Sequence, residues 1–284
     1  MRTLRDLGDI EGKRVLVRVD FNVPLEGRTV TDDTRIRASL PTLNELRRRG
    51  GRLVLVSHLG RPKDHEPELS LRPVADRLAE LADADVTFAP GVVGEDVRAF
   101  SENLAPGEIL MLENVRYEPG ETRDDPKLSA ALAELADVYV NDAFGAAHRA
   151  HCSTEGVAHL LTERAAGLLL EREVTVLTSL LERPAHPLVA VLGGAKVSDK
   201  LGVIERFFEI ADEILIGGAM CFPFFSATGH SVGASLCSEA DVELASRLLE
   251  GVPEAHAQLR LPVDLVIADR LASEARTRTI DGID

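Results

Sequence analysis

Short apolar runs alternate with longer amphipathic segments along most of the sequence. Runs near the start have the length and β-branched content of buried strands. The strands expected from them are residues 14–20, 52–58, 85–90, 108–115 and 137–142. Helical spacing of apolar residues indicates helices between them, at 35–51, 70–83, 92–104 and 126–137. Strands that alternate with helices pair in parallel, so the pattern predicts an α/β fold.

A long amphipathic segment divides this pattern into two arrays. It covers residues 166–184 and ends at Pro184. The strands expected beyond it are 187–194, 213–218 and 262–269. We therefore expect two Rossmann-like, doubly wound parallel-sheet domains joined by a long helix. The expected bounds are 1–166 for the first domain, 167–184 for the helix and 185–284 for the second domain.

One expected helix contains a proline. Residues 35–51 have helical periodicity, but Pro41 lies near their centre. Proline has no backbone N–H and clashes with the preceding turn of a helix. We therefore expect Pro41 to start or kink this helix rather than to lie in its middle.

Composition and charge exclude several classes of protein. The 284 residues are 45% hydrophobic and 28% charged, which is ordinary globular composition. A net charge of -15 argues against nucleic acid or an anionic membrane as partner. Three cysteines are too few and too scattered for a disulfide framework, and they fit a reducing compartment. With no leader-like apolar segment at the N-terminus, a cytoplasmic protein is expected.

The stretch from Leu188 to Phe207 combines a strand, a glycine turn and a helix. Five of the six residues up to Gly193 are apolar and predict a buried parallel strand, and Gly193 and Gly194 turn the chain. Such turns direct backbone N–H groups at phosphate, although many carry no ligand. Lys196 and Lys200, two of only five lysines, follow the glycines. A lysine binds phosphate as a compact point charge, so this turn is a candidate phosphate site.

Other strand ends carry groups that bind anions. In doubly wound sheets, ligands bind beyond the carboxyl ends of the strands. Guanidinium forks match the geometry of carboxylate and phosphate. The residues at or near these ends are Asp20, Asn22, Arg35, His58, Arg61, Arg116, His148, Arg149 and His151. Together they predict a site for a small, multiply charged anion.

Each of these residues also has a simpler interpretation. A single arginine is more often a solvated charge or an ion-pair partner. Asp20 and Asn22 are common turn residues, and His58 could cap a strand. His148 and His151 have the spacing of metal ligands, but no third ligand has suitable spacing. The anion site is favoured because four separate strand ends show the same chemistry.

Five motifs together resemble the phosphoglycerate kinase family, in that family's order. They are VDFNVP at 19–24, SHLGRP at 57–62, LENVRY at 112–117, NDAFGAAHRAH at 141–151 and LGGAKVSDK at 192–200. The resemblance implies reversible phosphoryl transfer between ATP and the carboxylate of 3-phosphoglycerate, with Mg²⁺ as cofactor bound with the nucleotide. It also implies a phosphoglycerate-binding first domain, a nucleotide-binding second domain, hinge closure between them and a monomer.

The resemblance assigns roles to residues of the matching motifs. Arg35 and Lys196 become the catalytic residues, on the carboxyl group and on the transferring phosphoryl group. The substrate-binding residues are Asp20, Asn22, Arg35, His58, Arg61, Arg116 and Arg149. The nucleotide-binding residues are Gly193, Gly194, Lys196 and Lys200. No metal ligand is expected within this chain.

The chain stops at Asp284, where the family continues. The absent part includes the loop whose aspartate helps to hold Mg²⁺ and the acidic residue that binds the ribose. We therefore expect the second domain to be incomplete, and kinase activity to be compromised while phosphoglycerate still binds. The alternative is a non-catalytic phosphoglycerate-binding fragment.

Two further enzyme classes have some support in the sequence. GHSVG at 229–233 matches the nucleophile elbow of serine hydrolases, with Ser231 as nucleophile. That motif needs a strand directly before it, and residues 221–229 are a poor strand. A dinucleotide oxidoreductase is disfavoured, because no G-x-G-x-x-G follows any expected strand.

Overall fold

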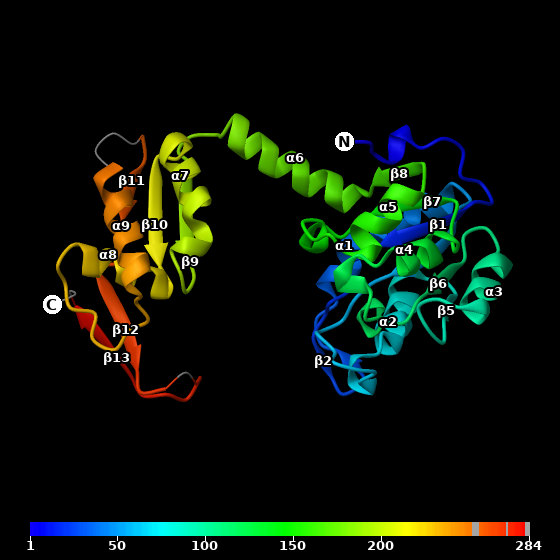
Figure 1. The fold of residues 1–284 in the computed structure, drawn as a ribbon, viewed down its shortest axis with the longest axis horizontal. Coiled ribbons are helices and arrows are strands. Elements are labelled where there is room, and N and C mark those ends of the chain that lie inside the picture. The colour runs from blue at the N-terminus through cyan, green and yellow to red at the C-terminus, as the bar shows by residue number, and fades with distance from the viewer. Residues whose placement is uncertain (252–255, 271, 282–284) are drawn as a thin grey trace. The chain divides into compact units, whose positions relative to one another are not determined.

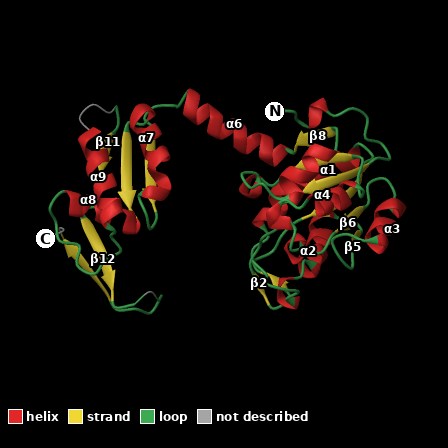
Figure 2. Ribbon diagram, viewed as in Figure 1, coloured by secondary structure: helices red, strands yellow, loops and turns green. Residues whose placement is uncertain are grey.

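The structure, a computed structural model, describes residues 1–251, 256–270 and 272–281. It divides into two compact units, Met1–Val176 and Leu177–Asp284 (Figure 1). The boundary falls inside helix α6 (Leu168–Glu182). Both units combine parallel strands with helices, which confirms the predicted α/β class (Figure 2).

A six-stranded parallel sheet forms the centre of the N-terminal unit. Its strands lie in the order β5-β6-β4-β1-β7-β8. Their bounds are β1 Arg14–Arg18, β4 Arg52–Val56, β5 Val86–Phe88, β6 Ile109–Met111, β7 Val138–Asn141 and β8 Glu163–Ala166. All but the edge strand β8 were predicted, and β8 has no apolar run to indicate it. A short hairpin, β2 (Leu25–Glu26) and β3 (Thr29–Val30), follows β1.

Helices cover both faces of this sheet. Their bounds are α1 Thr34–Arg48, α2 Arg72–Ala82, α3 Glu95–Asn103, α4 Pro126–Ala133 and α5 Val157–Leu160. Along β4, Leu53 and Leu55 belong to a buried cluster with residues of α1 and α2. The alternate residues Val54 and Val56 belong to a second cluster, with residues of α3, α4 and α5. Burial on both faces explains why these strands are continuous apolar runs.

We expected Pro41 to start or kink this helix rather than to lie in its middle, but helix α1 includes Pro41 in its interior, so the expectation that Pro41 would not lie mid-helix was wrong. The helix begins seven residues earlier, at Thr34, whose backbone N–H donates to Asp32 Oδ1 at 2.9 Å. Pro41 lies on the exposed side, whereas Ile36, Leu43 and Leu46 are fully buried. Burial of this apolar face outweighs the hydrogen bond that a mid-helix proline removes.

The C-terminal unit contains a smaller sheet. Three parallel strands lie in the order β11-β10-β9, with bounds β9 Val189–Gly193, β10 Glu213–Gly217 and β11 Gln258–Arg260. Its helices are α7 Leu201–Ile210, α8 Cys221–Ala227 and α9 Glu239–Gly251. The strand expected at 262–269 is present as β12 (Asp264–Ala268). It pairs antiparallel with β13 (Thr277–Asp281) in a separate two-stranded sheet.

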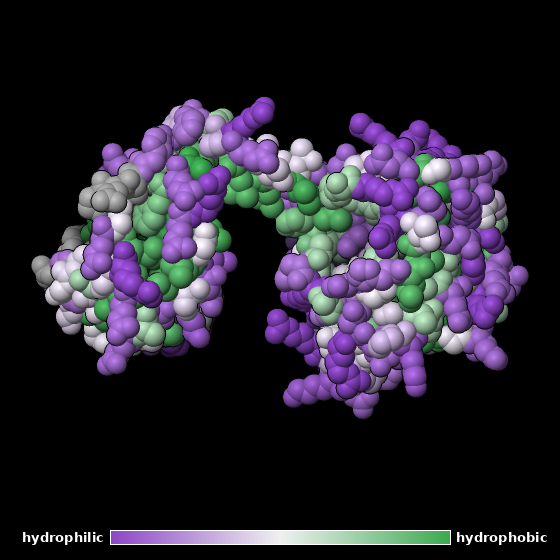
Figure 3. All heavy atoms as spheres, turned by 45° about the horizontal axis from the view of Figure 1, so that its top comes forward, coloured by the Kyte–Doolittle hydropathy of each residue, from purple (hydrophilic) through white to green (hydrophobic). Residues whose placement is uncertain are grey.

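One face of the three-stranded sheet is covered by helices. Ala190 and Ile214 belong to a buried cluster with residues of α7, α8 and α9. On β9 the alternate residues Val189 and Val191 are 46% and 75% exposed. The prediction of a buried parallel strand at 188–193 is confirmed for the parallel pairing, but it was wrong for the burial, because only one side of the strand is buried. Figure 3 shows green, apolar surface on this unit, at the left of the view.

The first backbone N–H groups of helix α6 donate hydrogen bonds to a buried carboxylate. Asp142 Oδ1 accepts from the backbone N–H of Leu169 at 2.9 Å and of Leu170 at 3.3 Å. Gly167 is required there, because a Cβ would lie 2.2 Å from that oxygen. Burial raises the pKa of Asp142 to about 6. None of the helices in the described ranges combines the length and apolar character needed to cross a bilayer.

Candidate functional site

The carboxyl ends of four adjacent strands meet at one edge of the N-terminal sheet. The strands are β6, β4, β1 and β7, which are neighbours in the sheet order. The predicted residues that follow them are Asp20, Asn22, His58, Arg61, Arg116 and Arg149. We define the arginine cluster as Arg18, Arg61, Arg116 and Arg149, together with His58. Arg18, the last residue of β1, was not predicted as a site residue.

Arg18 is almost fully buried, at 1% exposed. Its Nη2 lies 3.0 Å from His58 Nδ1, and its Nε donates to Ser153 Oγ at 2.8 Å. The Ser153 hydroxyl donates in turn to the buried carboxylate of Glu121 at 2.6 Å. Glu121 thus balances part of the Arg18 charge, as a buried cation requires. An arginine inside an apolar strand run is the sequence signal that could have found it.

His58 is a neutral hydrogen-bond donor. Burial and the positive charges of Arg18, Arg116 and Arg149 lower its pKa to about 2. A guanidinium group can only donate, so His58 Nδ1 accepts from Arg18 and the proton of the neutral ring lies on Nε2. The cluster therefore fixes the tautomer of this ring.

Arginines of the cluster line a cavity of about 490 Å³ that includes Arg61, Arg116 and Arg149. Burial and the charges of Arg149, Arg18 and Arg61 lower the pKa of Arg116. Guanidinium groups remain charged at neutral pH, so these like charges repel one another. An anion in the cavity would relieve this repulsion and find several forked donors.

A second cavity in this unit is larger but has different chemistry. Its volume is about 600 Å³, and carboxylates of Glu68 and Glu113 are among the lining groups. Glu113 is also engaged: it accepts from the Ser70 hydroxyl at 2.7 Å and from the Leu71 N–H at 2.9 Å. Size alone would favour this cavity, but its two carboxylates balance the guanidinium groups of Arg28 and Arg72 that also line it, so it lacks the positive charge of the arginine cluster.

Asp20, Asn22 and Arg35 lie on the loops next to the cluster. Asp20 Oδ2 accepts from Arg35 Nη1, and Asn22 Oδ1 accepts from the Gly60 N–H at 2.9 Å. Gly145 lies against the same carboxylate, since a Cβ there would be 2.8 Å from Asp20 Oδ2. Arg35 keeps its side chain 53% exposed. These contacts hold the polar groups in place while leaving Arg35 accessible.

His148 and His151 have separate contacts in the structure. His148 Nε2 accepts from Arg149 Nε at 3.3 Å, and His151 Nδ1 lies 3.7 Å from Glu121 Oε1. Both histidines therefore contact the arginine cluster or the glutamate that balances its charge. These contacts account for the two histidines without a metal ion.

The glycine turn of the C-terminal unit packs against a second glycine turn. Gly194 has φ +154°, and its carbonyl accepts from the Met220 N–H at 2.8 Å. Gly218, which follows β10, has φ +64°. A Cβ on Gly218 would lie 3.5 Å from the backbone of Gly194. Glycine at both positions permits these positive-φ conformations.

Lys196 and Lys200 are exposed on either side of Val197, whose side chain is fully buried. The buried valine anchors the turn. Lys196 lines a cavity of about 210 Å³ together with Asp241. That carboxylate accepts from Ser238 Oγ at 2.6 Å and from a backbone N–H at 3.2 Å. Both lysines thus follow the carboxyl end of β9, and Lys196 lines the cavity there.

The structure contradicts the serine hydrolase alternative. The element before Ser231 is helix α8, and α9 begins only at Glu239. A nucleophile elbow requires a strand, a sharp turn and a helix in immediate succession. The residues judged unsuited to a strand are helical over Cys221–Ala227, with Phe224 and Phe225 buried.

Comparison with known sequences gives one consistent family. A statistical model of the family described as phosphoglycerate kinase matches residues 4–284. A phosphoglycerate kinase of Rubrobacter xylanophilus is 53% identical over 280 residues, which cover 98% of this chain and 70% of the relative. That of Thermosipho africanus is 49% identical over 280 residues, covering 98% and 69%.

Solved structures agree with the sequence comparison. The phosphoglycerate kinase of Coxiella burnetii matches with a TM-score of 0.78 and 37% identity, covering 98% of this chain and 70% of that one. The enzyme of Pyrococcus horikoshii matches with a TM-score of 0.80 and 31% identity, covering 99% and 71%. The similarity therefore includes both units.

Proposed function

The chain belongs to the phosphoglycerate kinase family of phosphotransferases, which use a carboxyl group as acceptor, and we propose how its two units divide the reaction. The N-terminal unit binds 3-phosphoglycerate and the C-terminal unit binds ATP or ADP. One observation supports this division most strongly. Four arginines and a neutral histidine converge at one sheet edge, in a chain whose net charge is -15.

In this proposal the arginine cluster binds the phosphate that is not transferred. Arg61, Arg116 and Arg149 line the cavity and supply forked donors. His58 adds a neutral donor at Nε2, and Arg18 keeps that tautomer in place. A neutral donor adds a hydrogen bond to the phosphate without adding to the repulsion among the arginines of the free site. A mixture of neutral donors and cations therefore suits a phosphate group better than cations alone.

The glycerate end then lies toward the neighbouring loops. Asp20 and Asn22 bind its hydroxyl and carboxyl groups, and Arg35 contacts the carboxyl oxygen that reacts. The contacts of Asp20 with Arg35 and of Asn22 with Gly60 support this role, since they fix these side chains before substrate binds.

The nucleotide phosphates are assigned to the glycine turn. Gly193 and Gly194 let the backbone approach them, Lys200 binds them, and Lys196 contacts the phosphoryl group during transfer. The exposure of both lysines supports this assignment. Magnesium enters with the nucleotide as part of the substrate.

The chemistry requires little beyond positioning and positive charge. The substrate carboxylate is ionised at neutral pH, so it needs no general base to become a nucleophile. Arg35 and Lys196 stabilise the charge on the transferring group from the two sides. Because they belong to different units, transfer requires closure, which also excludes water from the phosphoryl group. Helix α6 is the proposed connection through which closure occurs.

The proposal includes a cytoplasmic, monomeric protein that binds no nucleic acid. The cysteines support a reducing compartment, because Cys152, Cys221 and Cys237 are all free thiols. The acidic net charge supports the absence of a nucleic-acid partner.

Calorimetric titration with two ligands tests the division of labour. Arg61→Ala should weaken 3-phosphoglycerate binding by at least about tenfold and leave Mg–ADP binding unchanged, because a charged hydrogen bond contributes roughly 1.5–3 kcal/mol. Lys200→Ala should show the reverse pattern. Arg98→Ala and Lys127→Ala, the same changes at exposed positions on α3 and α4, are the controls.

If Arg61→Ala binds 3-phosphoglycerate as tightly as the unaltered chain does, the arginine cluster is not the binding site of its phosphate. Loss of both ligands in a single variant would contradict the division between units. Circular dichroism of each variant separates these outcomes from a failure to fold.

A further inference from the structure

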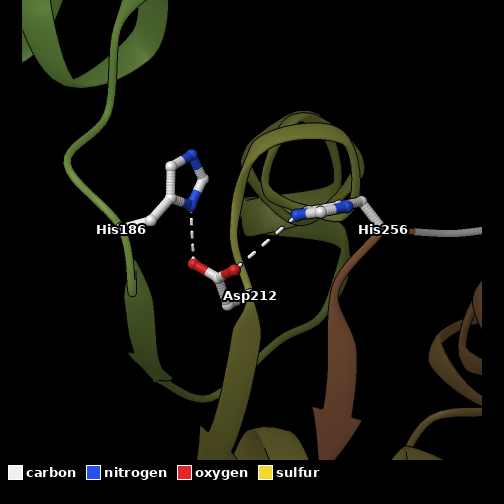
Figure 4. A group of neighbouring side chains, drawn as sticks. All are labelled: His186, Asp212 and His256. Atoms are coloured by element: carbon white, nitrogen blue, oxygen red, sulfur yellow. Dashed lines mark hydrogen bonds and ion pairs between the residues drawn. The ribbon is translucent and has the colours of Figure 1, made fainter.

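Three side chains meet at the edge of the C-terminal sheet opposite the glycine turn. His186 precedes β9, Asp212 precedes β10 and His256 precedes β11, each by one to three residues. These strands are neighbours and parallel, with Glu213 paired to both Val189 and Gln258. Parallel strands begin at the same edge, so residues just before them converge. Figure 4 shows both imidazoles directed at the carboxylate between them.

The distances are those of a potential metal site. His186 Nδ1 lies 2.8 Å from Asp212 Oδ2, and His256 Nε2 lies 3.7 Å from Asp212 Oδ1. One ligand atom from each residue can be chosen so that all three lie within 4.8 Å of one another. The side chains of His186, Asp212 and His256 are 53%, 34% and 58% exposed, so an ion can reach them from solvent.

Two imidazoles and one carboxylate are a known donor set for zinc and related divalent ions. With metal–ligand bonds of about 2.0–2.2 Å, tetrahedral ligand atoms lie about 3.3 Å apart. To bind an ion, the exposed side chains must rotate from the observed separations of 2.8 and 3.7 Å to about that value. Magnesium prefers oxygen ligands, so the ion of this site differs from the one that accompanies the nucleotide.

The backbone already supports the carboxylate. Asp212 Oδ2 accepts from the Leu188 N–H at 2.6 Å, which holds this side chain against the start of β9. Such outer contacts orient the ligands of metal sites. An ion bound at Nδ1 would take the place of the hydrogen bond between His186 and Asp212, and the proton of the neutral imidazole would then lie on Nε2.

We propose that His186, Asp212 and His256 bind a divalent cation of the zinc class and thereby tie together the starts of β9, β10 and β11. The site lies at the opposite end of β9 from Gly193 and Lys196. It is therefore separate from the nucleotide site, and neither proposal depends on the other.

Zinc and cobalt titrations of the full, untagged chain test the proposal. We expect one Zn²⁺ per chain by calorimetry, and with Co²⁺ the visible absorption of a four-coordinate ion. His256→Ala and Asp212→Asn should each weaken binding by at least about tenfold, as expected for loss of one ligand. His159→Ala is the matched control, because His159 is also exposed and lies 3.6 Å from one carboxylate, that of Glu155. It should bind as the unaltered chain does.

Absence of binding, or binding that persists in both His256→Ala and Asp212→Asn, would overturn the proposal. In that case the three side chains only link the starts of the strands through hydrogen bonds and ion pairs. Asp212→Asn retains an oxygen for the Leu188 N–H, and His256→Ala removes an exposed group. If one of these variants fails to fold, the other decides the question, and both are checked by circular dichroism.

Discussion

The two sheets of this chain use similar apolar strands but bury them differently. In the N-terminal unit, consecutive residues Leu16 and Val17 of β1 point to opposite faces and are both fully buried. In the C-terminal unit, Ala190 of β9 is 6% exposed, whereas the next residue, Val191, is 75% exposed. A continuous apolar run therefore identifies a strand of a parallel sheet, but it does not establish that both faces are covered.

The proposed sites differ in the same way. Arg18 and His58 are 1% and 5% exposed, so the arginine cluster is partly built into the core of its unit. Lys196 and Lys200 stand exposed on a turn that buried Val197 anchors. Substitutions in the arginine cluster should therefore alter both stability and binding, whereas substitutions of the lysines should alter binding alone.

The largest expected effect is that of Arg18→Met. The variant removes a buried cation and leaves the Glu121 carboxylate buried without it, which should destabilise the N-terminal unit by roughly 3 kcal/mol. Lys196→Met, the equivalent change at the exposed site, should alter stability by no more than about 0.5 kcal/mol. Urea unfolding followed by tyrosine fluorescence measures the first effect. Both tyrosines, Tyr117 and Tyr139, lie in the N-terminal unit, and the chain has no tryptophan.

Arg14→Met provides a control on the same strand. Arg14 pairs with Asp137, whose side chain is 42% exposed, and such pairs contribute about 1 kcal/mol or less. Equal stability of Arg18→Met and the unaltered chain would show that the cluster is not part of the core.

A matched valine pair tests the difference in coverage. Val54→Ala on β4 should cost the N-terminal unit roughly 2 kcal/mol, because a fully buried side chain leaves a cavity. Val191→Ala on β9 should change the C-terminal unit by about 0.5 kcal/mol or less. Hydrogen exchange with mass spectrometry measures the stability of each unit separately. Similar losses at both positions would mean that the exposed face of β9 is covered in solution.

The pH dependence of stability tests the neutral state of buried His58. The folded pKa of His58, about 2, lies below the ordinary 6.5, so below pH 6.5 the unfolded chain binds a proton that the folded chain does not. Stability should fall as the pH falls below about 6.5, by up to about 1.4 kcal/mol per pH unit for this residue. His58→Gln should reduce that slope. An unchanged slope between pH 5 and 7 would contradict the neutral state assigned to His58.

Most of the fold could be predicted from periodicity. Five of the six strands of the N-terminal sheet, the helices between them and the long helix follow directly from the pattern of apolar residues. The strand β8 could not, because ERAA has no apolar run and is held by pairing with β7. The position of Pro41 was also misjudged, since the burial of Ile36 and Leu43 stabilises the helix on both sides of it.

Residues of the candidate site could be proposed from the sequence where they follow a strand, but not where the grouping depends on tertiary contacts. Arg18 was overlooked because it lies within the expected strand rather than after it, and only the structure places His58 and Ser153 beside it. His186 and His256 are 70 residues apart in the sequence, and only the pairing of β9, β10 and β11 brings them to Asp212. The positions of these three residues in the sequence therefore give no indication that they lie together.

A crystal structure of the chain with 3-phosphoglycerate tests the central claim most directly. We predict that the phosphate oxygens accept hydrogen bonds from Arg61, Arg116 and Arg149 at about 2.7–2.9 Å, the distance of charge-assisted bonds. Phosphate bound instead at Lys196 and Lys200, or in the cavity beside Glu113, would contradict the assignment of the phosphoglycerate site to the arginine cluster.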